Sequence, residues 1–254
     1  MARKQRIHYE GALYHVIARG NNREYIYKNE EDKEEYIKKV TKYIGKYKAK
    51  LHAYVIMDNH CHLLIEVSDT PLSKIMQLIQ QTYTSWYNRN YKRSGHVFEQ
   101  RYKSILCDKD EYLLSLIRYI HQNPVRANIS GIDYKYSSHK EYIRGVNNVC
   151  LVEEALSMFS LNKKKAIESY IEFMDIEDSE VIEKSIDDLS PRFENIEAEI
   201  NKMIFDKKEL TEIVGSFEKR NEISIEEIKD KYLIGEKLRL RKPDDGKFIG
   251  WLSS

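Results

Sequence analysis

Two histidines separated by one residue interrupt an apolar stretch of the chain. His60 and His62 flank Cys61 within AYVIMDNHCHLLIEV. If this stretch is a β-strand, residues two apart point to the same side, so both imidazoles project together, about 7 Å apart. Imidazole is a common metal ligand, and two imidazoles on one face can bind the same divalent ion. The alternative for such a pair is one histidine in the core and one in solvent, without a metal.

A second segment, LIRYIHQNPVRAN, places a phenol and an amide on one helical face. Tyr119 and Asn123 are four residues apart, whereas His121 lies off their face. Packed against the histidine strand, this helix would offer the Asn123 amide oxygen as a third ligand, with the Tyr119 phenol one turn away. The alternative is that Tyr119 packs in the core and that Asn123 only ends the helix before Pro124. Spacing alone leaves both interpretations open.

The hydrophobic pattern predicts the elements that must position these side chains. Their order up to Pro124 is β-α-β-β-α-β-α. The expected strands and helices cover, in that order, residues 12–20, 31–48, 51–57, 61–67, 72–94, 96–107 and 108–123. The first six elements match the split βαβ, ferredoxin-like plan, an α+β fold with an antiparallel sheet and helices on one face. A helical C-terminal extension is expected to follow.

Charge divides the chain into two parts. Residues 1–150 hold 25 Lys and Arg against 16 Asp and Glu, a net charge of +9, whereas residues 151–254 hold 17 against 25, a net charge of −8. We therefore expect a basic domain over residues 1–148 with a polyanion as partner, and an acidic, mainly helical region over residues 149–254. The alternative is a basic domain neutralised by its own acidic extension.

The bulk composition narrows the class of protein. The chain has 254 residues, 41% of them apolar and 33% charged, which suits a folded core under a charged surface. There is no apolar run long enough to span a membrane, and MARKQRIHYE lacks the apolar segment of a secretory signal. The three cysteines are too irregularly spaced for a disulfide framework or a CxxC zinc site. These features predict a reduced, cytoplasmic protein.

Several motifs together carry a family resemblance. His60-Cys61-His62 resembles the His-hydrophobic-His signature of the HUH endonucleases, and RYIHQNPVRA resembles the catalytic helix of their single-tyrosine transposase branch. The segments YHVIARGNNR, YVIMDNHCHLLIEV and GHVFEQRYKSILCD support this resemblance. Their order and spacing are similar to those of insertion-sequence transposases and, more closely, REP-associated tyrosine transposases. The resemblance covers residues 8–145 and leaves the acidic region outside.

The resemblance implies a metal-dependent endonuclease and strand transferase that acts on single-stranded DNA. It implies that His60, His62 and Asn123 ligate a divalent cation and that Tyr119 is the nucleophile. Attack on a phosphodiester would link Tyr119 to the 5′-phosphate and release a 3′-OH, and a second 3′-OH could reverse the step. Such relatives often recognise a DNA hairpin beside the cleavage site and act as monomers or homodimers.

The chemistry of these residue types suits that reaction. Two neutral imidazoles and an amide leave the charge of the cation available to a phosphate, and this ligand set favours Mg²⁺ or Mn²⁺. A phenol is mostly protonated at neutral pH, so Tyr119 needs the field of the cation or of Arg118 or Arg126. Glu66 and Glu99 could act as bases, but we expect both to form surface ion pairs.

Cationic and amide side chains around the predicted site offer contacts to DNA. Cations on phosphates beside aromatic rings for base stacking are typical of single-strand binding. The predicted DNA-binding residues are Arg19, Asn21, Asn22, Arg23, Arg101, Lys103, Arg118 and Arg126.

Two other functions remain open from the residues. One is a domesticated, non-catalytic nucleic-acid-binding protein on the same fold. The other is a scaffold stabilised by zinc through the histidines and a further ligand such as Cys107.

Overall fold

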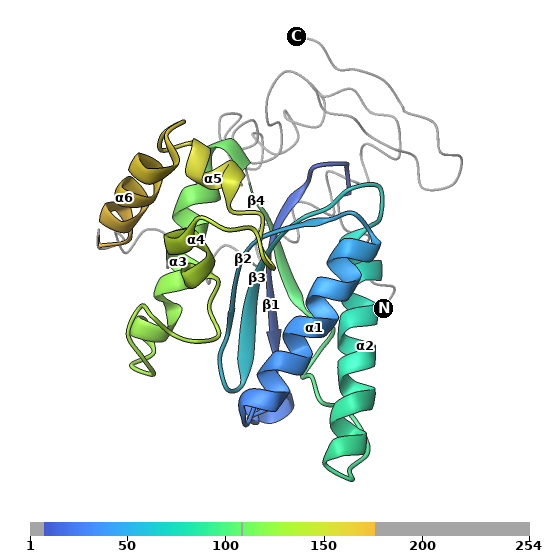
Figure 1. Cartoon of the computed structure of the whole chain (residues 1–254). Helices are drawn as coiled ribbons and strands as arrows, with labels where there is room; N and C mark the ends of the chain where they lie inside the picture. The colour runs from blue at the N-terminus through green and yellow to red at the C-terminus, as the bar shows by residue number, and fades with distance from the viewer. Residues whose placement is uncertain (1–7, 108, 176–254) are drawn as a thin grey trace, which may run out of the picture. The chain divides into compact units, whose positions relative to one another are not determined.

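A four-stranded antiparallel sheet forms the centre of the computed structural model, which describes residues 8–107 and 109–175 (Figure 1). Its strands are β1 (Leu13–Arg19), β2 (Lys50–Ile56), β3 (His60–Glu66) and β4 (Lys103–Cys107). They lie side by side in the order β2-β3-β1-β4, and every neighbouring pair is antiparallel. This order, with a helix after β1 and another after β3, confirms the predicted ferredoxin-like plan.

Six α-helices and one short 3₁₀ turn accompany the sheet in the described residues. They are η1 (Asn21–Arg23), α1 (Glu30–Lys46), α2 (Leu72–Asn90), α3 (Lys109–Arg126), α4 (His139–Arg144), α5 (Glu153–Ser157) and α6 (Lys163–Met174). α1 begins where the Asn29 side chain accepts a hydrogen bond from the backbone N–H of Asp32, which satisfies one of the free N–H groups of the first turn. None of the helices in the described residues is long and apolar enough to cross a membrane.

The two faces of the sheet are covered by different helices (Figure 1). Cys61 of β3 is buried on the face of α1, where its thiol lies 3.3 Å from the Tyr36 hydroxyl. The rings of Tyr27, Tyr36 and Tyr83 pack there with centroids 4.9 to 5.5 Å apart, joining α1 and α2. The predicted placement of helices on one face holds for α1 and α2, whereas α3 packs against β2 and β3 on the opposite face.

Three element boundaries lie three or more residues from the predicted ones, and one of them is the end of α2, at Asn90 instead of residue 94. β4 begins at Lys103 rather than at residue 96, because the preceding segment makes only an isolated bridge from Phe98 to Gly20. α3 continues through Pro124 instead of ending before it. The helix ends at Arg126, and two residues later Asn128 is in the left-handed conformation (φ 51°), where the N–H of Ile129 bonds the carbonyl of Pro124.

The segment after α3 folds back onto β2. Along the outer edge of β2, Ile56 donates to the carbonyl of Tyr136, Ser138 donates to that of Tyr54, and Leu151 donates to that of Leu51. These bonds satisfy backbone groups that an edge strand would otherwise expose.

A buried polar network joins α3, α4 and α6. The hydroxyl of Tyr170 lies 2.8 Å from Nδ1 of His121 and 2.7 Å from Nδ1 of His139. Nε2 of His121 lies 2.6 Å from the hydroxyl of Ser138. α6 therefore packs with the elements before residue 148, and α5 packs against α6. The division into domains at residue 148 stays a prediction, because residues 176–254 lie outside the described part of the chain.

The Tyr170 hydroxyl gives a test of this packing. Tyr170→Phe leaves two buried imidazole nitrogens without their partner, and each such loss costs about 1–3 kcal/mol. We expect a clear fall in the free energy of unfolding, measured by urea denaturation. Ile171→Ala is the matched control, because Ile171 is exposed on the same helix and such a change shifts stability by about 0.5 kcal/mol or less. Equal stability of the two variants would show that α6 is not part of the folded core.

Candidate active site

His60 and His62 lie on the face of the sheet that α3 covers. Their ring centroids are 5.1 Å apart, so both imidazoles project from β3 as the alternation of a strand predicts. His62 is buried and His60 half-buried. A third histidine, His15 of β1, stacks on His62 with ring centroids also 5.1 Å apart.

Each of the two paired histidines has its Nδ1 held by a neighbour. Nδ1 of His60 lies 2.6 Å from the side-chain oxygen of Asn59, and since that oxygen can only accept, the imidazole donates. Nδ1 of His62 lies 2.9 Å from Nε2 of His15. These bonds leave Nε2 of His60 and Nε2 of His62 as the nitrogens available to a ligand.

Burial keeps these imidazoles neutral. It lowers the pKa of His15 to about 4, and burial together with the positive charge of Arg19 lowers the pKa of His60 to about 4. Burial, and then the neighbouring His15, His60 and Arg19, hold the pKa of His62 well below its usual 6.5. At neutral pH each ring therefore keeps one nitrogen without a proton, as metal ligation requires.

Tyr119 lies against the histidines. Its ring meets His62 edge to face at a centroid distance of 5.9 Å and meets His15 in the same way at 5.7 Å. The Tyr119 residue is 8% exposed. The guanidinium of Arg126, two turns further along α3, lies 5.0 Å from the centroid of the Tyr119 ring. α3 thus brings a phenol and a cation to the histidine face within a single chain.

Asn123 lies one turn beyond Tyr119, on the same side of α3. Its side-chain nitrogen donates to the backbone carbonyl of Tyr119 at 2.9 Å, which leaves the side-chain oxygen as the acceptor. Asn123 is half-buried, and this burial is compatible both with a metal ligand and with a residue that only ends the helix. α3 in fact continues past this residue, so Asn123 does not end the helix.

The end of β1 and the η1 turn after it place four predicted DNA contacts beside the histidines. Arg19 pairs with His60 across the β1–β3 ladder and is exposed. Asn21, Asn22 and Arg23 form η1 directly after it. Gly20 fixes this loop, because its N–H bonds the carbonyl of Asn59, the residue that holds His60.

The remaining predicted DNA contacts lie in β4, in α3 and in the segment just before β4. Arg101 and Lys103 are exposed, and Arg126 is half-buried at the Tyr119 ring. Arg118 is buried, with its guanidinium 4.2 Å from the ring centroid of Phe173 in α6. This packing gives Arg118 a structural role, so its predicted contact with DNA has no support from its position.

His15 and Asn59 are the two site residues that the sequence analysis did not single out. His15 lies in YHVIARGNNR, 47 residues before its partner His62, so only strand pairing brings the two together. The signal in the sequence was the place of His15 in a strand-like segment. His15 is two residues after Leu13, and alternate residues of a strand lie on the same face. Asn59 directly precedes His60, and a turn asparagine next to a candidate ligand is the corresponding signal.

By residue type, the predicted ligand set suits a divalent metal ion. Two neutral imidazoles with available Nε2 atoms and one amide oxygen are ligands that Mn²⁺ and related ions accept, and Mg²⁺ would take the oxygen with bound water. The bonds from Asn59 and His15 resemble the outer contacts that orient metal-bound histidines in proteins.

A comparison with known families identifies this region. Residues 8–123 match the family model described as "Transposase IS200 like". These residues form an IS200-like transposase domain. The domain contains His15, His60, His62, Tyr119 and Asn123, whereas Arg126 and helices α4 to α6 lie beyond the matched residues.

Two solved structures are similar to the chain that contains the IS200-like domain. One is a REP-associated tyrosine transposase bound to a REP hairpin, at 15% identity and a TM-score of 0.49, over 59% of this chain and 90% of that chain. The other is a protein of Deinococcus radiodurans R1, provisionally described as a transposase, at 13% identity and a TM-score of 0.35, over 50% of this chain and 98% of that chain. No curated protein sequence matches the chain.

Gly20 of the IS200-like domain gives a test of the loop beside the histidines. A side chain at Gly20 would collide with the carbonyl oxygen of Glu24 and lie 2.8 Å from Cγ2 of Ile26. We expect Gly20→Ala to lower the free energy of unfolding by about 1–3 kcal/mol through overpacking. Gly45→Ala is the control, because nothing lies within 4 Å of that position in α1, and replacing a helical glycine stabilises by about 0.5–1 kcal/mol. Opposite signs in thermal unfolding confirm the close packing of the loop, and a neutral Gly20→Ala contradicts it.

Proposed function

We propose that the IS200-like domain is a metal-dependent endonuclease and strand transferase for single-stranded DNA, with Tyr119 as the nucleophile. The observation that carries this proposal is the contact of the Tyr119 ring with His62 and His15 in one chain, within a transposase domain. Because these side chains come from one chain, we propose that the tyrosine acts in cis, in a monomer or in each subunit of a homodimer.

The proposed reaction is a transesterification at phosphorus. The Tyr119 oxygen forms a bond to the phosphorus, the bond from phosphorus to the 3′-oxygen breaks, and that oxygen leaves as a 3′-OH with a proton. The product is a 5′-phosphotyrosine, which keeps the energy of the phosphodiester bond. A 3′-OH of the same or another strand can then attack it, restoring Tyr119 and joining the strands without a nucleotide cofactor.

Residues of the site have defined tasks in this scheme. His60 and His62, with the side-chain oxygen of Asn123, would hold Mg²⁺ or Mn²⁺, which supplies positive charge to a non-bridging phosphate oxygen. Arg126, beside the Tyr119 ring, favours the negative oxygen that develops as the phenol loses its proton. α3 holds the phenol so that the attacking group is already in place before DNA binds.

The DNA strand is proposed to follow the exposed cations beside the histidines. Arg19 ends β1 and Arg23 ends the η1 turn, while Arg101 precedes β4 and Lys103 begins it. The amides of Asn21 and Asn22 add uncharged contacts to bases or sugars. If the DNA forms a hairpin next to the cleavage site, the η1 turn could recognise the end of its duplex.

We assign His15 a positioning role in the same site. With Nδ1 of His62 bonded to His15, the His62 ring is held in the orientation that turns Nε2 to the ligand side. His15 also contacts the Tyr119 ring, so a single buried side chain sets the geometry of both the ligand and the nucleophile.

The two other functions have less support. Among the described residues, one group of three potential metal-binding His, Cys, Asp or Glu side chains comes together, and Cys107 is not part of it. The zinc scaffold through Cys107 is therefore disfavoured. A non-catalytic DNA-binding protein on this fold would keep the basic loop but would not need the contact of Tyr119 with the histidines.

Covalent trapping tests the nucleophile. Single-stranded hairpin oligonucleotides, labelled on the side 3′ to the cleavage site, are incubated with the full chain and Mn²⁺ and run on a denaturing protein gel. We expect the label to move onto the wild-type protein and not onto Tyr119→Phe, since only the hydroxyl is removed. Tyr112→Phe is the control, because Tyr112 is an exposed tyrosine of the same helix. Labelling of Tyr119→Phe at the wild-type level would overturn the assignment, and binding without any labelling would favour the non-catalytic alternative.

A pair of variants tests the role of His15. His15→Leu removes the bond to His62, whereas His15→Gln keeps a group that can hydrogen-bond there. Because outer partners of metal ligands are worth about 10–100-fold in affinity, we expect His15→Leu to raise the Mn²⁺ concentration for half-maximal labelling at least about tenfold. We expect His15→Gln to need less Mn²⁺ for half-maximal labelling than His15→Leu does, while the two variants have the same thermal stability. Identical Mn²⁺ dependence of both variants and the wild type would contradict the positioning role.

A further inference from the structure

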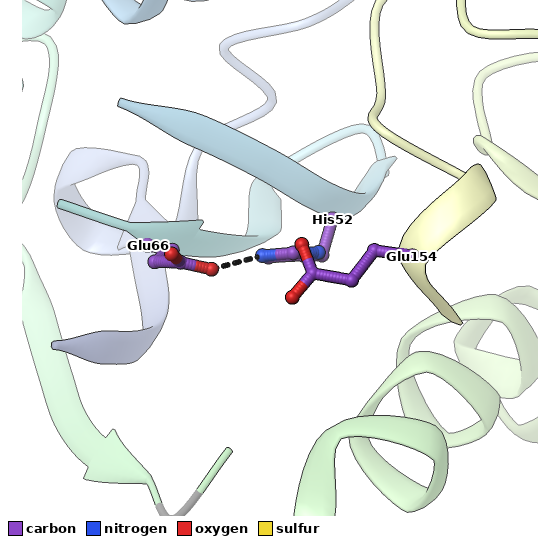
Figure 2. Close-up of side chains that lie close together, drawn as sticks. All are labelled: His52, Glu66 and Glu154. Atoms are coloured by element: carbon purple, nitrogen blue, oxygen red, sulfur yellow. Dashed lines mark hydrogen bonds and ion pairs between the residues drawn. The ribbon is translucent and has the colours of Figure 1, made fainter. Parts of the chain in front are cut away.

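A second cluster of potential metal ligands lies at the other end of β3 from His60. Figure 2 shows His52, Glu66 and Glu154 together, and one ligand atom from each lies within 4.8 Å of the others. Glu66 is six residues from His60 along β3, a separation of about 20 Å in a strand. The cluster is therefore distinct from the candidate active site.

The fold builds this cluster from three separate segments. The pairing of β2 with β3 shifts register between Leu51 and Ala53, so His52 is the extra residue of a β-bulge. Bulges redirect side chains, and this one brings Nε2 of His52 to 2.8 Å from a carboxylate oxygen of Glu66. Glu154 comes from α5, whose approach is fixed by the bond from the N–H of Leu151 to the carbonyl of Leu51.

Burial distinguishes the cluster from a surface ion pair. His52 is fully buried, and the Glu66 side chain is 10% exposed. We expected Glu66 in a surface ion pair; it does form ion pairs, but in a nearly buried position. Nδ1 of His52 is buried and has no hydrogen-bond partner among the described residues. A metal ion held by Glu66 would bind Nε2 of His52, the nitrogen that faces this carboxylate, and the ring proton would then stay on Nδ1.

A cation already lies between the two carboxylates. The ammonium of Lys50 is 3.0 Å from Glu66 and 3.4 Å from Glu154. This ammonium therefore occupies the place of a cation between the two carboxylates. The Lys50 side chain is 44% exposed, so it can turn into solvent and leave its position to another cation.

We propose that His52, Glu66 and Glu154 bind a divalent transition metal ion in exchange for the Lys50 ammonium. One imidazole nitrogen and two carboxylate groups suit Zn²⁺, Co²⁺ or Mn²⁺, and a doubly charged ion neutralises both carboxylates. Bound there, the ion links α5 to the open end of the β2–β3 hairpin. It stabilises the packing of the segment after residue 148 and takes no part in strand transfer.

Binding of Co²⁺ to the full chain tests the proposal. The chain carries His60→Ala and His62→Ala in every sample, so that the candidate active site contributes no signal. Co²⁺ affinity and stoichiometry are measured by calorimetry and by the visible absorption of the bound ion. In this background we expect one Co²⁺ per chain.

Three variants in this background distinguish the outcomes. Glu154→Gln should weaken Co²⁺ binding by at least about tenfold, since even outer partners of ligands are worth that much. Glu153→Gln, at the exposed neighbouring position of α5, should bind as the background does. Lys50→Gln removes the competing ammonium and should bind Co²⁺ more tightly, a gain that misfolding cannot produce.

The proposal is overturned by two results. One is equal Co²⁺ binding by Glu154→Gln and Glu153→Gln together with no gain in Lys50→Gln. The other is no Co²⁺ binding in any sample, which would make the cluster an ion-pair network completed by Lys50. Because none of these measurements uses DNA, failure here leaves the proposed function of Tyr119 untouched.

Discussion

The alternation of side chains along β3 is the constraint on which the rest of the structure depends. Cys61 faces the tyrosine cluster under α1, while its neighbours His60 and His62 face α3. A shift of one residue in the pairing of β3 with β1 would exchange these faces and bury the imidazoles among phenols. The register of β3 is therefore fixed by the apolar core on the α1 face of the sheet. The same register places the candidate site residues on the α3 face.

Neutral imidazoles follow from the same arrangement. The face under α3 is closed by side chains of β1 and α3, and this exclusion of water is what lowers the pKa values of His15 and His60 to about 4. The same burial would make the binding of a charged ligand unfavourable unless a ligand of opposite charge were bound with it. A dry site of neutral donors is thus suited to a cation that arrives together with an anionic phosphate.

The elements, and the shared faces of the candidate site residues, could be predicted from the sequence because these signals are local. Strand alternation gave the shared face of His60 and His62, and helical spacing gave that of Tyr119 and Asn123. Features that depend on tertiary contacts could not be predicted from the sequence. The pairing of His15 with His62 needs the strand order, and the burial of Arg118 needs α6. The bulge at His52 is likewise a product of cross-strand pairing and leaves no pattern in one strand alone.

The segment that folds back along β2 has a consequence for assembly. β2 ends the sheet on one side, and its backbone groups there already bond to Tyr136, Ser138 and Leu151. Two copies could not join their sheets through β2 without first removing this strap of their own chain. A continuous sheet across two subunits would have to form at β4, on the opposite margin and away from the α5 contact. The chain that follows the transposase domain thereby restricts which partners its sheet can accept.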